Sequence, residues 1–174
     1  QEKLNNSIYR IHTMAAIHEI LYQSGNFSQL HFSDIVEKLI DKIKSLSDEN
    51  CNIKVNINKV PVQLNINQAI PASLMLNEIL TNIYKHAFKG RDKGKIDIDI
   101  NEKNKETIIK IEDDGVGLSS NREKNPKSLG LSLVEILTQQ LQGQYKLYDT
   151  GSGTAFELRF KKSNIKGSGS SFID

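Results

Sequence analysis

The sequence of 174 residues contains one cysteine, no tryptophan and three prolines. A single thiol, Cys51, cannot form an internal disulfide or a paired-cysteine metal site, which favours a reducing compartment. No apolar run approaches the roughly 20 residues that a membrane-spanning helix needs, and the N-terminus lacks the apolar stretch of a signal peptide. We therefore expect a soluble chain. It begins at Gln1 without an initiator methionine, so we also expect a piece of a longer protein.

An excess of charge of one sign is also missing. Lysine and arginine number 23 and aspartate and glutamate number 21, which gives a formal net charge of +2. This balance argues against the strongly basic surface that is typical of nucleic-acid binders. The length fits one domain with a short appended element, and a hydrophobic fraction of 37% with only 6% aromatics predicts an aliphatic core.

Apolar residues at spacings of three and four predict a helix over 1–23 with a wide apolar face. Such a face packs either on the rest of the chain or on a partner helix in a dimer. Its central positions are Leu4, Ile8, Ile11, Ala15, His18 and Tyr22. After Gly25 and Asn26, Ser33 is expected to cap a second helix that ends near Ser47.

Alternating apolar residues predict strands at 51–58, 62–66, 95–100, 107–111, 145–148 and 155–160, with the polar turn NEKNKE between the third and the fourth. Helices are predicted over 69–88, with Pro71 in the first turn, and from about 128 to 142. The segment 113–127 is a long polar loop, and its length suggests a function. The C-terminal stretch KKSNIKGSGSSFID predicts a linker or disorder.

Several familiar motifs are incomplete. His12, His18 and His31 have no second His or Cys at a metal-ligand spacing. The run 90–95 is one residue short of a phosphate-binding P-loop and has Ile96 where Ser or Thr would reach magnesium. Neither glycine pair, at 115–117 or at 151–153, extends to GxGxxG, so a dinucleotide-binding fold has no support.

Four polar segments remain as candidates for chemistry. On the long helix, spacings of four and three put Glu78, Asn82 and Lys85 on one face. A carboxylate, an amide and an ammonium there would align a base, a metal ligand and a phosphate contact, or they form a solvated face with an i,i+4 hydrogen bond.

The second segment is DDGVG at 113–117, where an acid at the end of an apolar strand can accept a hydrogen bond from an exocyclic amine; the same residues also suit a plain turn. The third is GLSL at 130–133, whose helix N-terminus favours phosphate or is simply a helix start. The fourth, GSGT at 151–154, is by itself a hairpin turn.

Taken together and in this order, the four segments resemble the N, G1, G2 and G3 boxes of the GHKL ATPase superfamily. LNEILTNIYKHAF, IEDDGVGLS, SLGLSLVEILTQQLQG and GSGTAFEL are most similar to bacterial sensor histidine kinases whose first box reads NELxxNAxKHAF. RIHTMAAIHEILYQSG is similar to the second helix of the dimerisation and phosphoacceptor hairpin that precedes the catalytic domain in that subgroup.

The resemblance implies a two-layer α/β sandwich of the GHKL (Bergerat) type, in which a mixed, largely antiparallel sheet is covered by helices on one face. It also implies three parts: a partial dimerisation segment with a connector helix at 1–48, an ATP-binding catalytic domain at 49–162 and a flexible tail or linker at 163–174.

The resemblance further implies a role for each matching residue. Glu78 is expected to orient or deprotonate the attacking group, Asn82 to coordinate Mg²⁺ between the ATP phosphates, and Lys85 to contact phosphate. Asp113 is expected to accept a hydrogen bond from the adenine amino group. Gly115 and Gly117 are expected to give the lid freedom to move, and Thr154 to close the base pocket. Gly130 and Leu131 are expected at the helix under the phosphates, and His86 is a further expected nucleotide-binding residue.

The sequence departs from the family pattern at three points. Ile83 replaces the alanine that usually follows the metal-binding asparagine, the lid at 118–129 is short and lacks phenylalanine, and the acceptor helix HRxKNN is missing. His18 matches a position of the second hairpin helix that is not the acceptor. We therefore expect this chain alone to be unable to phosphorylate itself.

The expected activity is transfer of the ATP γ-phosphate to a histidine upstream of Gln1, followed by relay to a response-regulator aspartate. Expected partners are a second copy of the chain through 1–48 and a receiver domain, with no nucleic acid and no membrane contact. The expected location is cytoplasmic, alone or as part of a membrane-anchored sensor. The alternatives are an anti-sigma-factor serine kinase with the same nucleotide site, and an ATP-gated switch without kinase chemistry, which needs further domains.

Overall fold

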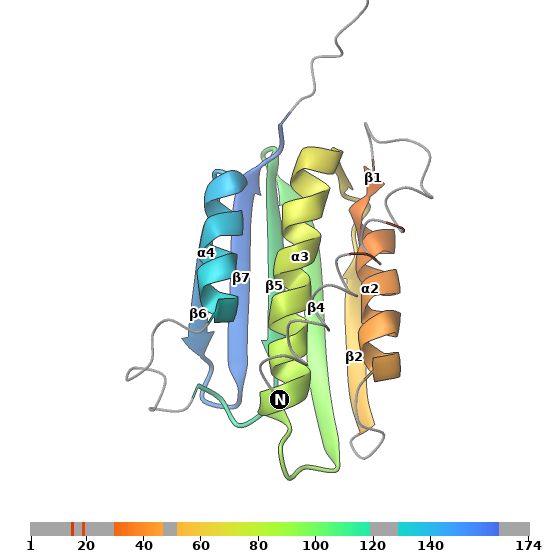
Figure 1. Cartoon of the computed structure of the whole chain (residues 1–174), viewed down its shortest axis with the longest axis vertical. Coiled ribbons are helices and arrows are strands. Elements are labelled where there is room, and N and C mark those ends of the chain that lie inside the picture. The colour runs from red at the N-terminus through yellow and green to blue at the C-terminus, as the bar shows by residue number, and fades with distance from the viewer. Residues whose placement is uncertain (1–14, 16–18, 20–29, 47–51, 119–128, 164–174) are drawn as a thin grey trace, which may run out of the picture.

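The computed structural model describes residues 15, 19, 30–46, 52–118 and 129–163 of the chain. A five-stranded sheet in the order β2-β4-β5-β7-β6 is covered on one face by helices (Figure 1). The strands are β2 (Asn52–Lys59), β4 (Lys93–Lys103), β5 (Glu106–Asp113), β6 (Gln144–Asp149) and β7 (Thr154–Lys161). β2 and β4 pair in parallel and the other neighbours are antiparallel. The predicted fold is confirmed.

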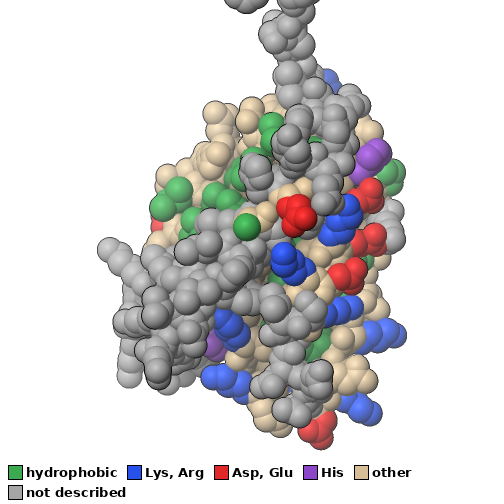
Figure 2. Space-filling model, turned by 45° about the vertical axis from the view of Figure 1, so that its right-hand side comes forward, with side chains coloured by type: hydrophobic (Ala, Val, Ile, Leu, Met, Phe, Trp, Pro, Cys, Tyr) green, Lys and Arg blue, Asp and Glu red, His purple; other side chains and the backbone are tan. Residues whose placement is uncertain are grey.

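The central strands β4 and β5 alternate buried and more exposed residues, because successive side chains point to opposite faces of a sheet. Ile96, Ile98 and Ile100 of β4 pack under the helices. The opposite face is charged, as in the ion pair of 2.6 Å between Lys95 and Asp97. Figure 2, which views the molecule partly from the helix side, shows acidic and basic side chains intermixed along its right-hand side as well.

The helix α2 (Phe32–Leu46) buries its apolar face in the same core as α3 and the sheet. It follows a two-residue strand, β1 (Leu30–His31), that pairs with β3 (Gln63–Leu64). The backbone N–H of Phe32 donates to the carbonyl of Val62 at 2.9 Å. This pairing fixes the start of the helix at Phe32, so the expectation that Ser33 caps the helix is wrong, and Ser33 is a buried residue of its first turn.

The long helix α3 (Ile66–Asn82) begins earlier than expected. Asn65 is its N-cap, and the side chain of Asn65 accepts a hydrogen bond from the backbone N–H of Gln68 at 3.1 Å. The predicted strand over 62–66 therefore shrinks to β3, and Ile66 is helical. Pro71 consequently lies beyond the first turn, as the sixth residue of the helix, where it is buried.

The end of the predicted helix has a different hydrogen-bond pattern from the rest of the helix. Ile83–Ala87 forms a π-helix, η1, before a turn at Phe88–Gly90. Hydrogen bonds in a π-helix close one residue later than in an α-helix. The chain stays helical to Ala87, close to the predicted end at residue 88, but its last turn is a π-helix and not a regular α-helix.

The hairpin between β4 and β5 is tighter than the expected six-residue turn. Its two connecting residues, Asn104 and Lys105, both have positive φ, 55° and 63°. Two left-handed residues match the right-handed twist of paired strands, so the strands extend further toward the turn. β4 includes Lys103 and β5 starts at Glu106.

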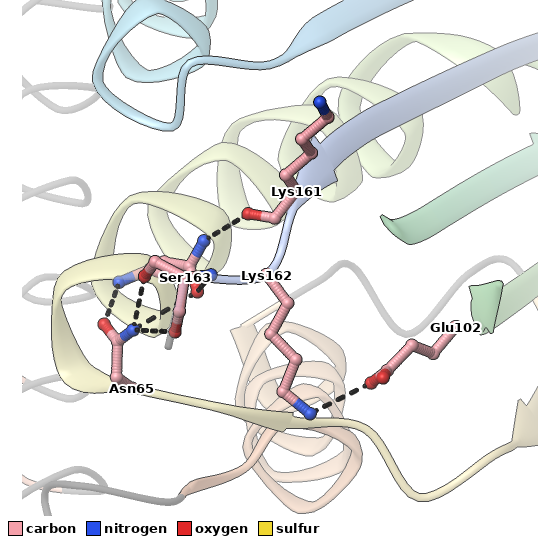
Figure 3. A network of polar contacts seen from close by, with 6 residues as sticks. Asn65, Glu102, Lys161, Lys162 and Ser163 are labelled. Carbon is pink, nitrogen blue, oxygen red and sulfur yellow. Dashed lines mark hydrogen bonds and ion pairs between the residues drawn. The ribbon is translucent and has the colours of Figure 1, made fainter. Parts of the chain in front are cut away.

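The beginning of the predicted tail is ordered, which corrects the expectation of a linker from Lys161. Lys161 ends β7, and its carbonyl accepts a hydrogen bond of 2.8 Å from Nε2 of Gln68. The hydroxyl of Ser163 accepts a hydrogen bond of 2.8 Å from Nδ2 of Asn65 (Figure 3). Lys162 pairs with Glu102 at 3.1 Å. These contacts join the end of the sheet to the start of α3.

Other expectations fall partly outside the described residues. Of the helix expected over 1–23, only Ala15 and Glu19 are described, both helical and exposed. Cys51, the segment 119–128 and the tail from 164 lie outside. The C-terminal helix α4 (Leu129–Gln140) is confirmed close to its predicted bounds. Within the described part of the chain, no helix is long and apolar enough to cross a membrane.

Candidate functional site

A cavity of about 390 Å³ opens where the end of α3, η1 and the start of α4 meet the ends of three strands. These ends of α3 and α4 lie toward the lower end of the molecule in Figure 1. Helices and sheet contribute to its wall together. It is lined by Ile79, Asn82, Ile83, His86, Ala87, Ile111, Asp113, Val116, Gly117, Leu131, Leu147, Thr154 and Phe156. Most of these side chains are apolar, which suits a flat, weakly polar ligand with a few directed hydrogen bonds.

The sheet side of the cavity consists of cross-strand neighbours. Ile111 of β5 pairs with Phe156 of β7, which pairs with Leu147 of β6. In the next row, Thr154 pairs with Asp113 on one side and with Asp149 on the other. Antiparallel register therefore brings together segments that lie about forty residues apart in the sequence.

Asp113 is the buried acid of the cavity, with only 3% of its surface exposed. Burial raises the pKa of its carboxyl, and the backbone N–H groups of Gly115 and Thr154, which hydrogen bond to the carboxylate, oppose that increase. The N–H of Gly115 lies 2.9 Å from Oδ1. An acceptor held in this way at an apolar wall can recognise an N–H donor of a ligand.

The glycine loop, defined here as residues 115–118, follows Asp113 and is fixed at its start. A Cβ on Gly115 would lie 2.5 Å from the carbonyl oxygen of Ala87, so only glycine fits there. That same carbonyl accepts a hydrogen bond of 2.9 Å from the N–H of Val116. The end of the π-helix thus holds the loop against the cavity.

Asp114 holds the same loop against the start of β4. Its Oδ1 accepts a hydrogen bond of 2.7 Å from the N–H of Lys95, and its carbonyl accepts one from the guanidinium of Arg91. The two adjacent acids therefore have different roles: Asp113 faces the cavity, and Asp114 anchors the loop to the start of β4.

The helix side of the cavity contains two of the expected residues, Asn82 and His86. Glu78 is 5% exposed and lies on the preceding turn, outside the cavity lining. Lys85 is exposed and also lies outside the lining. The shared face expected for Glu78, Asn82 and Lys85 assumed an α-helix, whereas Lys85 lies in the π-helix that begins at Ile83.

Of the remaining predicted residues, Gly117, Leu131 and Thr154 line the cavity, whereas Gly115 and Gly130 lie next to lining residues in the sequence and are not part of the lining. Gly115, Gly117 and Thr154 surround Asp113, while Leu131 contributes from the first turn of α4. Gly130 precedes it as a buried residue of that turn. The N-terminus and positive dipole end of α4 therefore point to this end of the molecule.

Sequence reasoning missed the apolar walls and Asp149. Ile111, Leu147 and Phe156 were seen only as strand residues, because their common position depends on register between strands. Ile83, noted as bulkier than the usual alanine, is 7% exposed and lines the cavity, so its bulk is part of the wall.

Metal binding by the protein alone has no support among the described residues, which contain no group of three or more His, Cys, Asp or Glu side chains that could hold an ion. The side-chain oxygen of Asn82 fits Mg²⁺, a cation that prefers oxygen ligands and usually takes only one or two from protein when phosphates supply others.

Comparisons with known proteins agree with this geometry. Residues 67–164, more than half of the chain, match the family model described as histidine kinase-, DNA gyrase B-, and HSP90-like ATPase, and residues 1–47 match a histidine kinase model. A curated relative, blue-light-activated histidine kinase 2 of Erythrobacter litoralis, is 29% identical over 116 residues. That match covers 66% of this chain and 34% of the relative, so the chain spans about a third of the relative's length.

Solved structures have the same fold. The histidine kinase domain of the Erythrobacter litoralis EL346 blue-light activated histidine kinase has a TM-score of 0.77 at 21% identity, with coverage of 90% of this chain and 81% of the other. The Acinetobacter baumannii histidine kinase AdeS has a TM-score of 0.64 at 20% identity, with coverage of 94% and 80%. These matches give no support to the anti-sigma-factor alternative.

Proposed function

Because the chain belongs to the histidine kinase-, DNA gyrase B-, and HSP90-like ATPases, and within them to the sensor histidine kinases, we propose that it is the ATP-binding catalytic part of such a kinase. The observation that carries the proposal is the buried carboxylate of Asp113 at the floor of an apolar cavity. A purine has two apolar faces and an exocyclic amine at its edge. In this arrangement Ile79, Leu147 and Phe156 contact the faces, and Asp113 accepts from the amine.

The phosphates of ATP would extend toward Asn82 and the start of α4. The amide oxygen of Asn82 is suited to Mg²⁺, which would neutralise phosphate charge when bound. Gly130 and Leu131 belong to a helix N-terminus, where backbone N–H groups favour anions. Lys85 is exposed near this end, and we assign its ammonium group to contact a phosphate oxygen.

The reaction that we propose is attack of a histidine imidazole nitrogen on the γ-phosphorus. An N–P bond forms, the bond to the leaving ADP oxygen breaks, and the imidazole proton passes to a base. Glu78, one turn before Asn82, is the carboxylate that we assign to orient the imidazole or to receive its proton. The phosphoryl group then passes to an aspartate of a response regulator.

The arrangement of the whole protein is part of the same proposal. The match of residues 1–47 to a histidine kinase model supports a dimerisation role for the segment 1–48, next to a catalytic domain at 49–162. We place the acceptor histidine upstream of Gln1 and the protein in the cytoplasm, where a receiver domain and ATP are available.

Calorimetric titration with ATP·Mg²⁺ and with adenosine tests the proposal. We expect Asn82→Ala to weaken ATP far more than adenosine, because its role is at the phosphates. We expect Asp113→Asn to weaken both, since the amide leaves a hydrogen-bond mismatch that costs about 1 to 3 kcal/mol. Asp99→Asn, an exposed change outside the cavity, is the matched control. Equal losses of ATP and adenosine in Asn82→Ala would contradict the assignment.

A further inference from the structure

Asp149 is an acid at the end of β6 that the sequence did not single out and that does not line the cavity. Its two carboxylate oxygens have different partners. Oδ2 accepts a hydrogen bond of 2.9 Å from the N–H of Leu118, and Oδ1 accepts one of 2.7 Å from the N–H of Gly151. One side chain thus contacts both the glycine loop and the turn between β6 and β7.

Both of these segments contribute residues to the cavity wall. Val116 and Gly117 come from the glycine loop, while Leu147 and Thr154 come from the strands on either side of the β6–β7 turn. The loop is held at its start by Ala87 and Asp114. At its other end, the described contact that joins it to the hairpin is the carboxylate of Asp149.

The fit between Gly117 and Asp149 supports a specific role for this contact. Gly117 has φ of +74°, which favours glycine, and a Cβ at this position would lie 2.6 Å from Oδ2 of Asp149. The carboxylate therefore lies directly against the backbone of Gly117, and the glycine permits this close approach as well as the left-handed turn.

The β6–β7 turn is in turn fixed to the floor of the cavity. The N–H of Thr150 donates to the carbonyl of Gly153 at 3.0 Å. A Cβ on Gly153 would lie only 1.8 Å from the carbonyl oxygen of Asp113, so the hairpin backbone packs directly on the residue that carries the buried acid. Movement of the turn would therefore also displace Asp113 and Thr154.

We propose that Asp149 is a positioning residue for nucleotide binding, which sets the width of the base-binding cavity by joining the glycine loop to the β6–β7 turn. The inference rests on the proposed function, because it concerns the same site. Asp149 touches neither base nor phosphate in this scheme and acts through Gly117, Leu118 and Gly151. An asparagine has one acceptor oxygen, so it can satisfy one of the two backbone N–H groups and sets an NH₂ group against the other.

The test compares Asp149→Asn with Asp99→Asn, which removes the same charge from an exposed site outside the cavity. Titration with adenosine and with ATP·Mg²⁺ should show both ligands weakened about threefold to tenfold in Asp149→Asn, because one hydrogen bond at the wall is lost. Asp99→Asn should bind as the natural chain does. Asp99→Asn should unfold within about 2 °C of it, since substitutions on the exposed surface seldom change stability by more.

A double-mutant cycle sharpens the assignment. Gly117→Ala should also weaken adenosine, because its Cβ displaces the carboxylate of Asp149. Asp149→Asn should then add little, since the contact is already broken. The proposal would be overturned if the losses of binding free energy in the two single variants simply added in the double variant. It would also be overturned if Asp149→Asn bound adenosine as tightly as the natural chain, or if Asp99→Asn weakened binding as much as Asp149→Asn does.

Failure of the proposed function would look different. If the natural chain binds neither adenosine nor ATP·Mg²⁺, nucleotide binding is wrong whatever Asp149 does. Amide hydrogen exchange then still tests the contact: faster exchange at Leu118 and Gly151 in Asp149→Asn, with the sheet unchanged, would retain Asp149 as the link between loop and turn. Unchanged exchange at both amides would remove that link as well.

Discussion

Two acids on the sheet show how environment separates chemically identical side chains. Burial raises the pKa of Asp113 at the cavity floor, although its carboxylate accepts hydrogen bonds from two backbone N–H groups, which act to lower that pKa. Burial also opposes ionisation of Asp97, but hydrogen bonds from Lys95 and Asn56 outweigh it and hold the pKa of Asp97 below its ordinary value. The two residues therefore contribute to stability in opposite pH ranges.

We predict opposite pH dependences for Asp113→Asn and Asp97→Asn without nucleotide. A raised folded-state pKa gives Asp113 a stabilising contribution that is present below pH 3.8, the ordinary aspartate value, and is lost as pH rises through the folded pKa. Asp97 contributes stability above pH 3.8 that is lost as pH falls through its lowered pKa. Urea unfolding of each variant and of the natural chain across pH 2 to 8 measures the loss of unfolding free energy in each variant. If this loss changed with pH in the same direction for both variants, the prediction would be contradicted.

Glu78 provides the residue-scale prediction for chemistry. As a general base, it contributes to rate rather than to affinity, by roughly 10² to 10⁴. In the protein that includes the acceptor histidine, Glu78→Gln should therefore keep ATP binding and lose autophosphorylation. Radiolabel transfer and calorimetry measure the two properties separately, with Glu135→Gln on the exposed face of α4 as the control. Unchanged labelling would return Glu78 to a structural role.

At the scale of elements, the junction of α3 with the end of the sheet explains how the long helix is held. Asn65 caps the helix and also donates to the hydroxyl of Ser163, while Gln68 donates to the carbonyl of Lys161 (Figure 3). Because Asn82 lies at the other end of α3, these contacts fix the helix that carries the candidate phosphate end of the site.

We predict that Asn65→Ala lowers the free energy of unfolding by about 1 to 2 kcal/mol, the usual cost of losing an N-cap. Asn67→Ala changes an exposed residue two positions further along and should have little effect. Urea unfolding of both variants measures the difference. Similar losses in the two variants would mean that the cap and its link to Ser163 contribute nothing specific.

At the scale of the whole molecule, α2, α3, α4 and the sheet share one hydrophobic core. The second helix, which the sequence grouped with the dimerisation segment, therefore packs in the same core that borders the cavity. The division at residue 48 stays a prediction about domains, but in this fold α2 also supports α3 from the side opposite α4 (Figure 1).

The whole-molecule prediction concerns phosphorylation. Incubation of residues 1–174 with radiolabelled ATP and magnesium should leave the chain unlabelled, because we place the acceptor upstream. A longer form of the protein that includes the preceding residues should label on a histidine. Acid-labile phosphate on His12, His18 or His31 of the present chain would contradict this.

Sedimentation of the same sample tests dimerisation through Leu4, Ile8, Ile11 and Ala15.

The sequence alone determined the fold class and the identity of the acid at the cavity floor. Alternating isoleucines in β4 and β5 and the apolar periodicity of α3 and α4 are local patterns, so they can be recognised without knowing the neighbours. The resemblance likewise pointed to Asp113 and Asn82, which both line the cavity, although their ligands stay predictions.

Only the tertiary structure decided the features that depend on contacts between distant segments. Register between β5, β7 and β6 placed Leu147 and Phe156 in the cavity wall and Asp149 against Gly117. The hydrogen bond that the N-cap residue Asn65 donates to Ser163 also joins residues that lie 98 positions apart in the sequence. The π-helix at Ile83–Ala87, which contains Lys85, likewise could not be read from α-helical spacing. Periodicity reports neighbours along one element, whereas these features arise where separate elements meet.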